Sequence, residues 1–371
     1  MKFIDHIDIN PKISLEKGKI YPFVEMSNVS TTNREPDLID YKEFSSGVKF
    51  EDYDTVIARI EPCLQNGKRF FVRNIKKGFG STEYLVFRPK DDSVDAIFLY
   101  YFMQSDFIKK SMIGSMTGAT GRQRVHNDIF KALEISLPSI EVQRKIGQIL
   151  SVYDDLIENN QKQIKLLEEA SQRLYKEWFV DLRFPGYEDV EIVDGVPEEW
   201  EKEQIGNIIG MVPRTKQIKT ADYLLEGAIP VIDQSRNFIA GYTNDGEALV
   251  NTKTPVIVFG DHTRILKYIQ FPFAKGADGT QLIISDRTNM PQSLLYLSLI
   301  AVDLSNYHYA RHFKYLKSES ILIPSQNIAD EFDRLISPIF SQIQMLRNKC
   351  YKLSEARDRL LPKLMSGEIE V

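Results

Sequence analysis

The chain has a proline-free stretch between Pro138 and Pro185 in which apolar residues recur at alternating steps of three and four. This spacing, kept over several heptads with charged residues on the other faces, predicts a coiled-coil helix. At 1.5 Å per residue, forty helical residues span about 60 Å, and a helix of that length needs a partner to cover its apolar seam. The seam residues expected to pair are Leu150, Tyr153, Ile157, Ile164, Leu167 and Leu174.

The C-terminal part of the chain repeats this stretch. Pro324 stands 186 positions after Pro138, and the same offset carries Arg173-Leu174 onto Arg359-Leu360. Because identity and heptad phase agree, the sequence predicts a tandem repeat of a globular segment followed by a long helix. Two equivalent helices pair most simply antiparallel, about an approximate two-fold axis, with the globular segments at opposite ends of a rod. The second seam comprises Ile339, Ile343, Leu346, Leu353 and Leu360, with Arg357 at the position of Ser171.

Each globular segment alternates apolar strand patterns with glycine and proline turns, which predicts a mixed α/β (α+β) domain. One helix is expected over 96–108, and strands over 132–137 and 318–323 lead into the two long helices. The expected boundaries are a first globular domain at 1–138, a first long helix at 139–184, a linker at 185–204, a second globular domain at 205–324, and a second long helix with a tail at 325–371.

Bulk composition narrows the class of protein. The two cysteines, Cys63 and Cys350, fall in different repeats, which excludes a disulfide framework and favours a reducing, cytoplasmic location. No run of eighteen apolar residues occurs and the N-terminus is too polar for a signal peptide, so no membrane partner is expected. A net charge of −5 argues weakly against nucleic acid, although basic residues gather in loops of the globular segments.

Signatures of catalysis are missing from the sequence. No Pro-Pro occurs, so an Asn-Pro-Pro-Tyr methyltransferase loop is absent, and no Gly-x-x-x-x-Gly-Lys-Ser/Thr phosphate loop is present. Asp37, Asp40 and Lys42 imitate a nuclease set but are expected within one polar turn, whereas metal hydrolysis needs carboxylates that converge from separate strands. His308 and His312 have zinc spacing without a nearby third ligand. The chain is therefore predicted to be non-catalytic, with no metal and no cofactor of its own.

A glycine-spaced, basic loop over 114–127 is the main binding candidate, because Arg and Gln have the geometry that reads guanine and adenine edges. A surface loop without a ligand is an equally good interpretation. The counterpart over 306–314 carries aromatic residues that either contact DNA or pack in the core, and 260–264 is a third candidate. The DNA-binding candidates are Arg59, Lys68, Arg69, Arg73, Lys76, Lys77, Thr117, Thr120, Arg122, Gln123, Arg124 and His126 in the first repeat, and Lys216, Lys219, His262, Thr263, Arg264, Lys267, Tyr307, His308, Arg311, His312 and Lys314 in the second.

The order of elements resembles the DNA specificity subunit of a Type I restriction-modification system. The resemblance is carried by Leu137-Pro138, Gln143-Arg144-Lys145-Ile146, the segments 166–170, 174–179 and 196–200, and the C-terminal segment 359–369. It implies that each globular segment is a target-recognition domain reading one half of a split sequence in double-stranded DNA. It also implies that the helices set the gap and dock two methyltransferase subunits, that restriction subunits join the complex, and that AdoMet, ATP and Mg²⁺ bind only to those partners.

A second interpretation stays open from the residues alone. The chain could be a structural coiled-coil adaptor whose globular ends bind proteins, and the acidic pI of about 5.7 supports that view. Salt-dependent retention on DNA in the presence of a methyltransferase partner distinguishes the two, because phosphate contacts release counterions.

Overall fold

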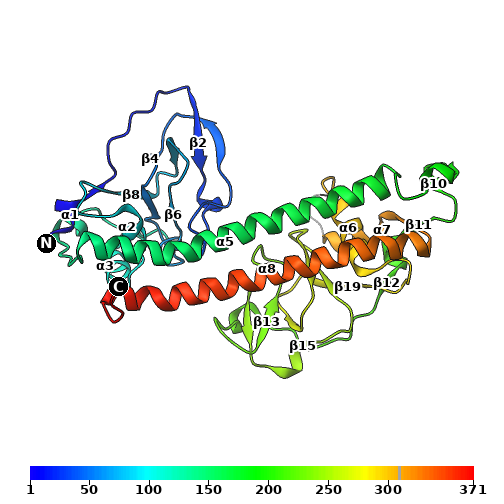
Figure 1. Cartoon of the computed structure of the whole chain (residues 1–371). Helices are drawn as coiled ribbons and strands as arrows, with labels where there is room; N and C mark the ends of the chain where they lie inside the picture. Colours follow the sequence, from blue (N-terminus) through cyan, green and yellow to red (C-terminus); the bar gives the residue numbers. More distant parts are fainter. Residues whose placement is uncertain (308–310) are drawn as a thin grey trace. The chain divides into compact units, whose positions relative to one another are not determined.

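The structure is a computed structural model that describes residues 1–307 and 311–371 (Figure 1). The chain divides into two compact units: unit 1 consists of Met1–Lys162 and Arg347–Val371, and unit 2 of Gln163–Leu346. Two long helices, α5 (Ile140–Tyr175) and α8 (Gln326–Ser366), each contribute one part to each unit. Unit 1 is therefore assembled from both ends of the chain, whereas unit 2 is continuous.

Unit 1 contains two four-stranded sheets. The first, entirely antiparallel, has the order β1-β8-β5-β6, formed by β1 (Ile7–Ile9), β8 (Tyr84–Pro89), β5 (Thr55–Ala58) and β6 (Arg69–Phe71). The second has the order β3-β2-β7-β4, formed by β3 (Asp40–Glu43), β2 (Ile20–Val24), β7 (Lys77–Gly80) and β4 (Val48–Glu51), in which β2 and β7 are parallel. Gly78 lets β7 pass through this sheet, because a Cβ there would lie 2.7 Å from the Phe50 ring.

The helices of unit 1 cover the first sheet and close its core. They are α1 (Phe3–His6), α2 (Ala96–Phe102), α3 (Asp106–Gly114) and α4 (Ile129–Ala132), together with the first part of α5 and the last part of α8. Phe3, Phe87, Phe130, Leu150 and Leu364 meet in one buried cluster. The end of α8 is therefore part of the core that the N-terminal residues build.

Two expectations about local structure in unit 1 are wrong. The helix expected over 96–108 is broken, because Ser105 caps a new helix by accepting a hydrogen bond from the Ile108 N–H. The strand expected over 132–137 reduces to a single bridge between Lys2 and Glu134. Residues 1–3 supply its only ladder partner among the described residues, and that ladder is too short for a strand.

Unit 2 repeats both sheets strand for strand. One has the order β12-β19-β16-β17, from β12 (Ile209–Gly210), β19 (Thr280–Ser285), β16 (Val256–Gly260) and β17 (Leu266–Ile269). The other has the order β14-β13-β18-β15, from β14 (Gly241–Thr243), β13 (Ile229–Ile232), β18 (Phe273–Lys275) and β15 (Leu249–Val250). Here β13 and β18 form the parallel pair, as β2 and β7 do in unit 1. The matching orders confirm the predicted repeat.

The remaining elements of unit 2 connect these sheets to the long helices. They are α6 (Gln292–Ala301), α7 (His312–Ser318), the pair β9 (Ile192–Val193) and β10 (Val196–Pro197), and the pair β11 (Glu201–Gln204) and β20 (Ser320–Ile323). Short turns complete the chain: η1 (Met26–Asn28), the π-helical η2 (Lys176–Val180), η3 (Tyr187–Asp189), η4 (Ile205–Asn207), η5 (Thr220–Asp222) and η6 (Gly246–Ala248).

The two long helices pair antiparallel within each unit (Figure 1). In unit 1, Arg357 contacts Asp154 and the Cys350 thiol donates to the Ile157 carbonyl oxygen at 3.7 Å. In unit 2, the ring centroids of Trp178 and Phe332 lie 5.5 Å apart. Of the predicted seam residues, Leu150, Ile157, Ile343 and Leu346 are buried, and Tyr153, Ile164, Leu167, Leu174, Ile339, Leu353 and Leu360 are half-buried.

Within the described ranges, neither long helix nor any other is apolar enough over a sufficient length to span a bilayer.

Candidate nucleic-acid interface

In unit 1 the glycine-spaced loop folds against the end of the fully buried strand β5. Thr117 and Arg124 exchange both backbone N–H···O bonds, at 3.2 and 3.0 Å. The Val125 N–H donates to the Arg59 carbonyl oxygen, and the Glu61 N–H donates to the Gln123 carbonyl oxygen, both at 2.9 Å. The base of the loop thus extends the sheet, while its tip, residues 118–122, is exposed to solvent.

Two glycines allow the tight turn at this tip. Gly118 and Gly121 have φ values of 123° and 80°, which side chains with a Cβ rarely adopt. The Gly121 N–H also donates to the Glu61 carboxylate at 2.9 Å. The glycine spacing seen in the sequence therefore has a backbone reason in addition to any role in binding.

The two loop arginines have different surroundings. Arg124 Nε lies 2.9 Å from both carboxylate oxygens of Glu83, and its Nη2 lies 2.8 Å from Oε1. This hydrogen bonding lowers the pKa of Glu83 below its usual value. The Arg122 guanidinium is exposed and has no partner among residues 1–307 and 311–371. Arg124 therefore positions the loop, and Arg122 is the side chain left available to a ligand.

Thr117 and His126 also bond to each other, 2.5 Å apart between Oγ1 and Nε2, at the exposed base of the loop. Thr120 is exposed at the tip, and Gln123 is half-buried beside it. Lys76 and Lys77 are exposed at the start of β7, and Arg59 is half-buried with an Nε that has no hydrogen-bond partner within the described part of the chain.

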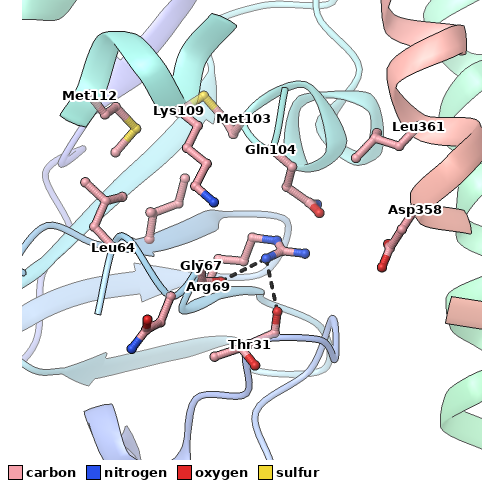
Figure 2. A pocket seen from close by; sticks show the side chains of 12 residues that line it. Thr31, Leu64, Gly67, Arg69, Met103, Gln104, Lys109, Met112, Asp358 and Leu361 are labelled. Carbon is pink, nitrogen blue, oxygen red and sulfur yellow. Dashed lines mark hydrogen bonds between the residues drawn. The ribbon is translucent and has the colours of Figure 1, made fainter. Parts of the chain in front are cut away.

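Three other basic candidates of unit 1 are engaged internally. Lys68 Nζ donates to the Met26 carbonyl oxygen at 2.6 Å, and Arg73 pairs with Asp155 at 2.9 Å. Arg69 projects into a cavity of about 260 Å³ and donates to the carbonyl oxygens of Gly67 and Thr31, at 2.8 and 3.4 Å (Figure 2).

In unit 2 the equivalent strand β16 ends in the turn 261–264. The Asp261 N–H donates to the Gly279 carbonyl oxygen at 2.7 Å, and the Thr263 hydroxyl donates to the Gln234 carbonyl oxygen at 2.7 Å. The His262 N–H donates to the Gln234 side-chain oxygen at 3.1 Å. This turn exposes His262, Thr263 and Arg264, although Arg264 also donates to a backbone carbonyl, that of Leu304, at 2.9 Å.

The N-terminus of α7 contacts the same turn. The His312 N–H donates to the Asp261 carbonyl oxygen at 2.9 Å, and the Phe313 N–H donates to the Asp261 carboxylate at 2.8 Å. The His312 ring is 6% exposed, and burial lowers its pKa, so this side chain belongs to the packing. Its neighbours Arg311 and Lys314 are exposed.

The other candidates of unit 2 have mixed placements. Tyr307 stacks on Tyr315 with ring centroids 4.1 Å apart, and its hydroxyl donates to Glu319. Lys216 pairs with Asp245 at 2.6 Å, and Lys219 is exposed. His308 lies outside the described residues, and so does the geometry of the His308/His312 spacing. In unit 1, Asp40 and Lys42 of the nuclease-like set lie on the strand β3, not in a turn as expected.

Lys267 does not fit a role in DNA contact. Its side chain is 4% exposed, its Nζ donates to the Asn237 carbonyl oxygen at 2.5 Å, and Asp233 lies 3.9 Å away. Burial lowers the pKa of Lys267 from 10.5 to about 8. Lys267 lies on strand β17 with its side chain buried, and not in a surface loop.

Replacing Lys267 with Met is expected to change how stability depends on pH. Between about pH 8 and pH 10.5 the unfolded chain retains the lysine proton and the folded chain loses it, so stability rises with pH by up to about 1.4 kcal/mol per unit. Lys267→Met removes this rise. Urea denaturation followed by tryptophan fluorescence measures it, because Trp178 and Trp200 both lie in unit 2. If the free energy of unfolding changed with pH equally in the two proteins over this range, Lys267 would not be the group that loses its proton on folding.

Several residues that hold these loops were not predicted from the sequence. Glu61 and Glu83 fix the loop of unit 1, and Gln234 and Asp261 fix the turn of unit 2. The role of Glu83 could have been inferred from strand pairing. Glu83 directly precedes β8, which pairs with β5, and this places it beside the end of β5 where the loop is anchored. The anchors in unit 2 come from segments far apart in sequence.

Comparisons with known proteins bear on this arrangement. A family model of the Type I restriction modification DNA specificity domain matches residues 8–169. The Type I restriction enzyme MjaIX specificity subunit of Methanocaldococcus jannaschii is 27% identical over 310 residues, which cover 76% of this chain and 71% of the relative. The EcoR124I/EcoR124II specificity subunit of Escherichia coli is 27% identical over 199 residues, 48% of each chain. The solved S subunit of a Type I restriction-modification system from M. genitalium has the same fold, with a TM-score of 0.56 at 16% identity over 98% of this chain and 95% of that one.

Two repeated sheet units, each with an anchored loop at the end of its central strand, define a recognition protein with two modules. Residues 8–169 match a Type I restriction modification DNA specificity domain, and most of the chain is similar to Type I specificity subunits. These relatives are named as specificity subunits of Type I restriction enzymes. The resemblance seen in the sequence is thereby confirmed.

Proposed function

We propose that each unit reads one half of a bipartite target in double-stranded DNA. Unit 1 reads through the tip of its loop, residues 118–122, and unit 2 through the turn 261–264 with Arg311 and Lys314. One observation carries this proposal: the two units share both sheet orders, while the segments at the ends of the equivalent strands β5 and β16, residues 118–122 and 261–264, differ in sequence and chemistry. Two readers of different half-sites require a common scaffold with different loops.

Among the candidate residues of unit 1, Arg122 has the clearest role in base recognition. Its guanidinium is exposed at the loop tip, unpaired within the described ranges, and its planar fork matches the two acceptors of guanine in the major groove. Exposed lysines such as Lys76, Lys77 and Lys219 supply phosphate contacts, which fix the register of the protein on DNA without reading sequence. Local positive charge of this kind is compatible with an acidic chain.

The long helices are proposed to set the gap between the half-sites and to dock two methyltransferase subunits, with restriction subunits completing the complex in the cytoplasm. AdoMet, ATP and Mg²⁺ then bind to those partners. Support comes from the family, whose members are named subunits of Type I restriction enzymes, and from the helix pairing seen in each unit. Methyltransferase subunits that bind normally to a variant lacking both helices would contradict the docking role.

Arg122→Ala tests the DNA-reading role. In complex with the partner methyltransferase, the variant is expected to lose about 1–3 kcal/mol of binding, on the order of 10- to 100-fold, at one half of the target. Fluorescence anisotropy with targets altered in one half at a time measures the loss, over a range of salt concentrations. Thermal stability should stay unchanged, because the Arg122 side chain has no hydrogen-bond or ion-pair partner within the described part of the chain.

Lys110→Ala is the matched control, since Lys110 is an exposed cation of unit 1 on α3, with an 81% exposed side chain. It should bind both halves as the unaltered chain does. Equal losses at both halves for Arg122→Ala would contradict its assignment to one half-site. If the unaltered complex shows no salt-dependent retention on DNA, the adaptor interpretation replaces the proposed function.

A further inference from the structure

A buried ion pair joins the two long helices within unit 1. Asp154 of α5 is 1% exposed and Arg357 of α8 is 3% exposed, and the carboxylate accepts a hydrogen bond from the guanidinium. The Tyr101 hydroxyl donates to the other carboxylate oxygen. Arg357 also donates to the Thr32 carbonyl oxygen at 3.1 Å. A buried charge in this cluster depends on its partner, because the low-polarity surroundings do not solvate it alone.

The repeat places different chemistry at the equivalent positions of unit 2. The offset of 186 residues carries Asp154 onto Phe340 and Ser171 onto Arg357. Phe340 is 4% exposed, and its ring centroid lies 4.7 Å from that of Tyr268. Ser171 is fully buried and its hydroxyl donates to the Leu167 carbonyl oxygen at 2.9 Å. A large apolar residue and a small one thus replace the anion and the cation.

We infer that this difference is a pairing code, which makes the helix of the first repeat accept the helix of the second and reject a copy of itself. If two copies of α5 paired antiparallel in the observed register, Asp154 of each would face Ser171 of the other. If two copies of α8 paired, Arg357 of each would face Phe340 of the other. A pair of first repeats would bury two Asp154 carboxylates without a cation, and a pair of second repeats would leave each Arg357 only the exposed Asp358 of its own helix, at 2.8 Å. The pair within one chain joins Asp154 to Arg357.

The partner excluded by this code is a second copy of the same chain. Repeated helices with nearly the same seam invite exchange between chains, and apolar packing alone discriminates poorly between them. Loss of one member of a buried pair is strongly unfavourable, so a pair of first repeats is disfavoured by on the order of a hundredfold or more. The inference rests on the helix contacts and the repeat, and it holds whether or not the units read DNA.

The test uses two full-length copies with different tags on the first repeat, each with a protease site inserted between Gly186 and Gly195. The copies are co-expressed, purified through one tag and then cleaved, and native mass spectrometry shows which repeats remain bound. For the unaltered chain, first-repeat/first-repeat pairs are expected at no more than about 1%. Asp154→Phe with Arg357→Ser, which gives unit 1 the seam chemistry of unit 2, should raise them at least tenfold.

Ser171→Arg provides a second test that does not depend on the stability of that double variant. It places the missing cation opposite Asp154 in a pair of first repeats, so first-repeat/first-repeat pairs should increase. Ser171→Met is the matched control, since it adds similar bulk without charge, and it should produce fewer such pairs. Equal pairing for Arg and Met, or abundant self-pairs in the unaltered chain, would overturn the pairing code.

Discussion

Exchanging residues 1–136 for the equivalent segment of another Type I specificity subunit is expected to change one half of the recognised DNA sequence and to leave the other half unchanged. The reason is that the loop at the end of β5 and the residues that anchor it, Arg59, Glu61 and Glu83, all travel with this segment. The turn 261–264 and its anchors stay behind in unit 2. Each altered base pair contributes about 1–3 kcal/mol, so the original half-site should be lost outright.

Methylation-sensitive sequencing of DNA modified by the hybrid complex measures the result. The exchanged segment also packs on the long helices. Its Phe3 shares a buried cluster with Leu364 of α8, and its Arg34 pairs with Glu158 of α5. The donor segment should therefore keep those contact residues. A matched exchange of 205–319 should change the other half only. A hybrid with both halves altered would show that the two units do not read independently.

Arg34→Met is expected to destabilise unit 1 by about 3–5 kcal/mol, because it removes the bidentate partner of the buried Glu158 carboxylate. The Arg34 side chain is 3% exposed, with Nε 2.9 Å and Nη2 2.7 Å from the two carboxylate oxygens of Glu158, and Nη2 2.5 Å from Asp155. Burial already raises the pKa of Glu158 above its usual value, and Arg34 opposes that effect. Hydrogen exchange read by mass spectrometry measures the loss of stability unit by unit.

Arg73→Met is the natural control, since Arg73 contacts the same Asp155 but is 38% exposed. An ion pair that solvent reaches contributes about 1 kcal/mol or less. Tryptophan fluorescence supplies an internal reference, because both tryptophans lie in unit 2 and its unfolding midpoint should not move. Equal losses for the two variants would show that the burial of Arg34 does not set its contribution.

The long helices and the repeat could be predicted from sequence because they depend on local periodicity. The seam from Leu150 to Leu174 and its copy from Ile339 to Leu360 follow from residues three and four apart on one face. The order of the strands could not be predicted, since pairs such as β2 with β7 join segments that no turn connects. The break within 96–108 depends on one cap, Ser105, inside an otherwise helical pattern.

The candidate interface was predicted only in part, because a sequence shows local patterns but not pairings between distant residues. Glycines and arginines adjacent in sequence marked the loop around Arg122, but the pairing of Arg124 with Glu83 spans 41 residues and left no local trace. Lys267 was misplaced because a lysine within a short strand has the same pattern whether its side chain points outward or into the core. Only the packing of Asn237 and Asp233 around it decides between the two.

The division of the chain into units has a consequence for its synthesis. Unit 2 is complete once residue 346 has been made, whereas unit 1 still lacks the helix segment that carries Arg357 and Leu364. At typical translation rates of about 5–20 residues per second, residues 163–371 take roughly 10–40 s to add. During that time Asp154 has no cation and the core around Phe3 stays open. The part of the protein made first is thus finished last, and in a growing chain it is the part most in need of protection from misfolding.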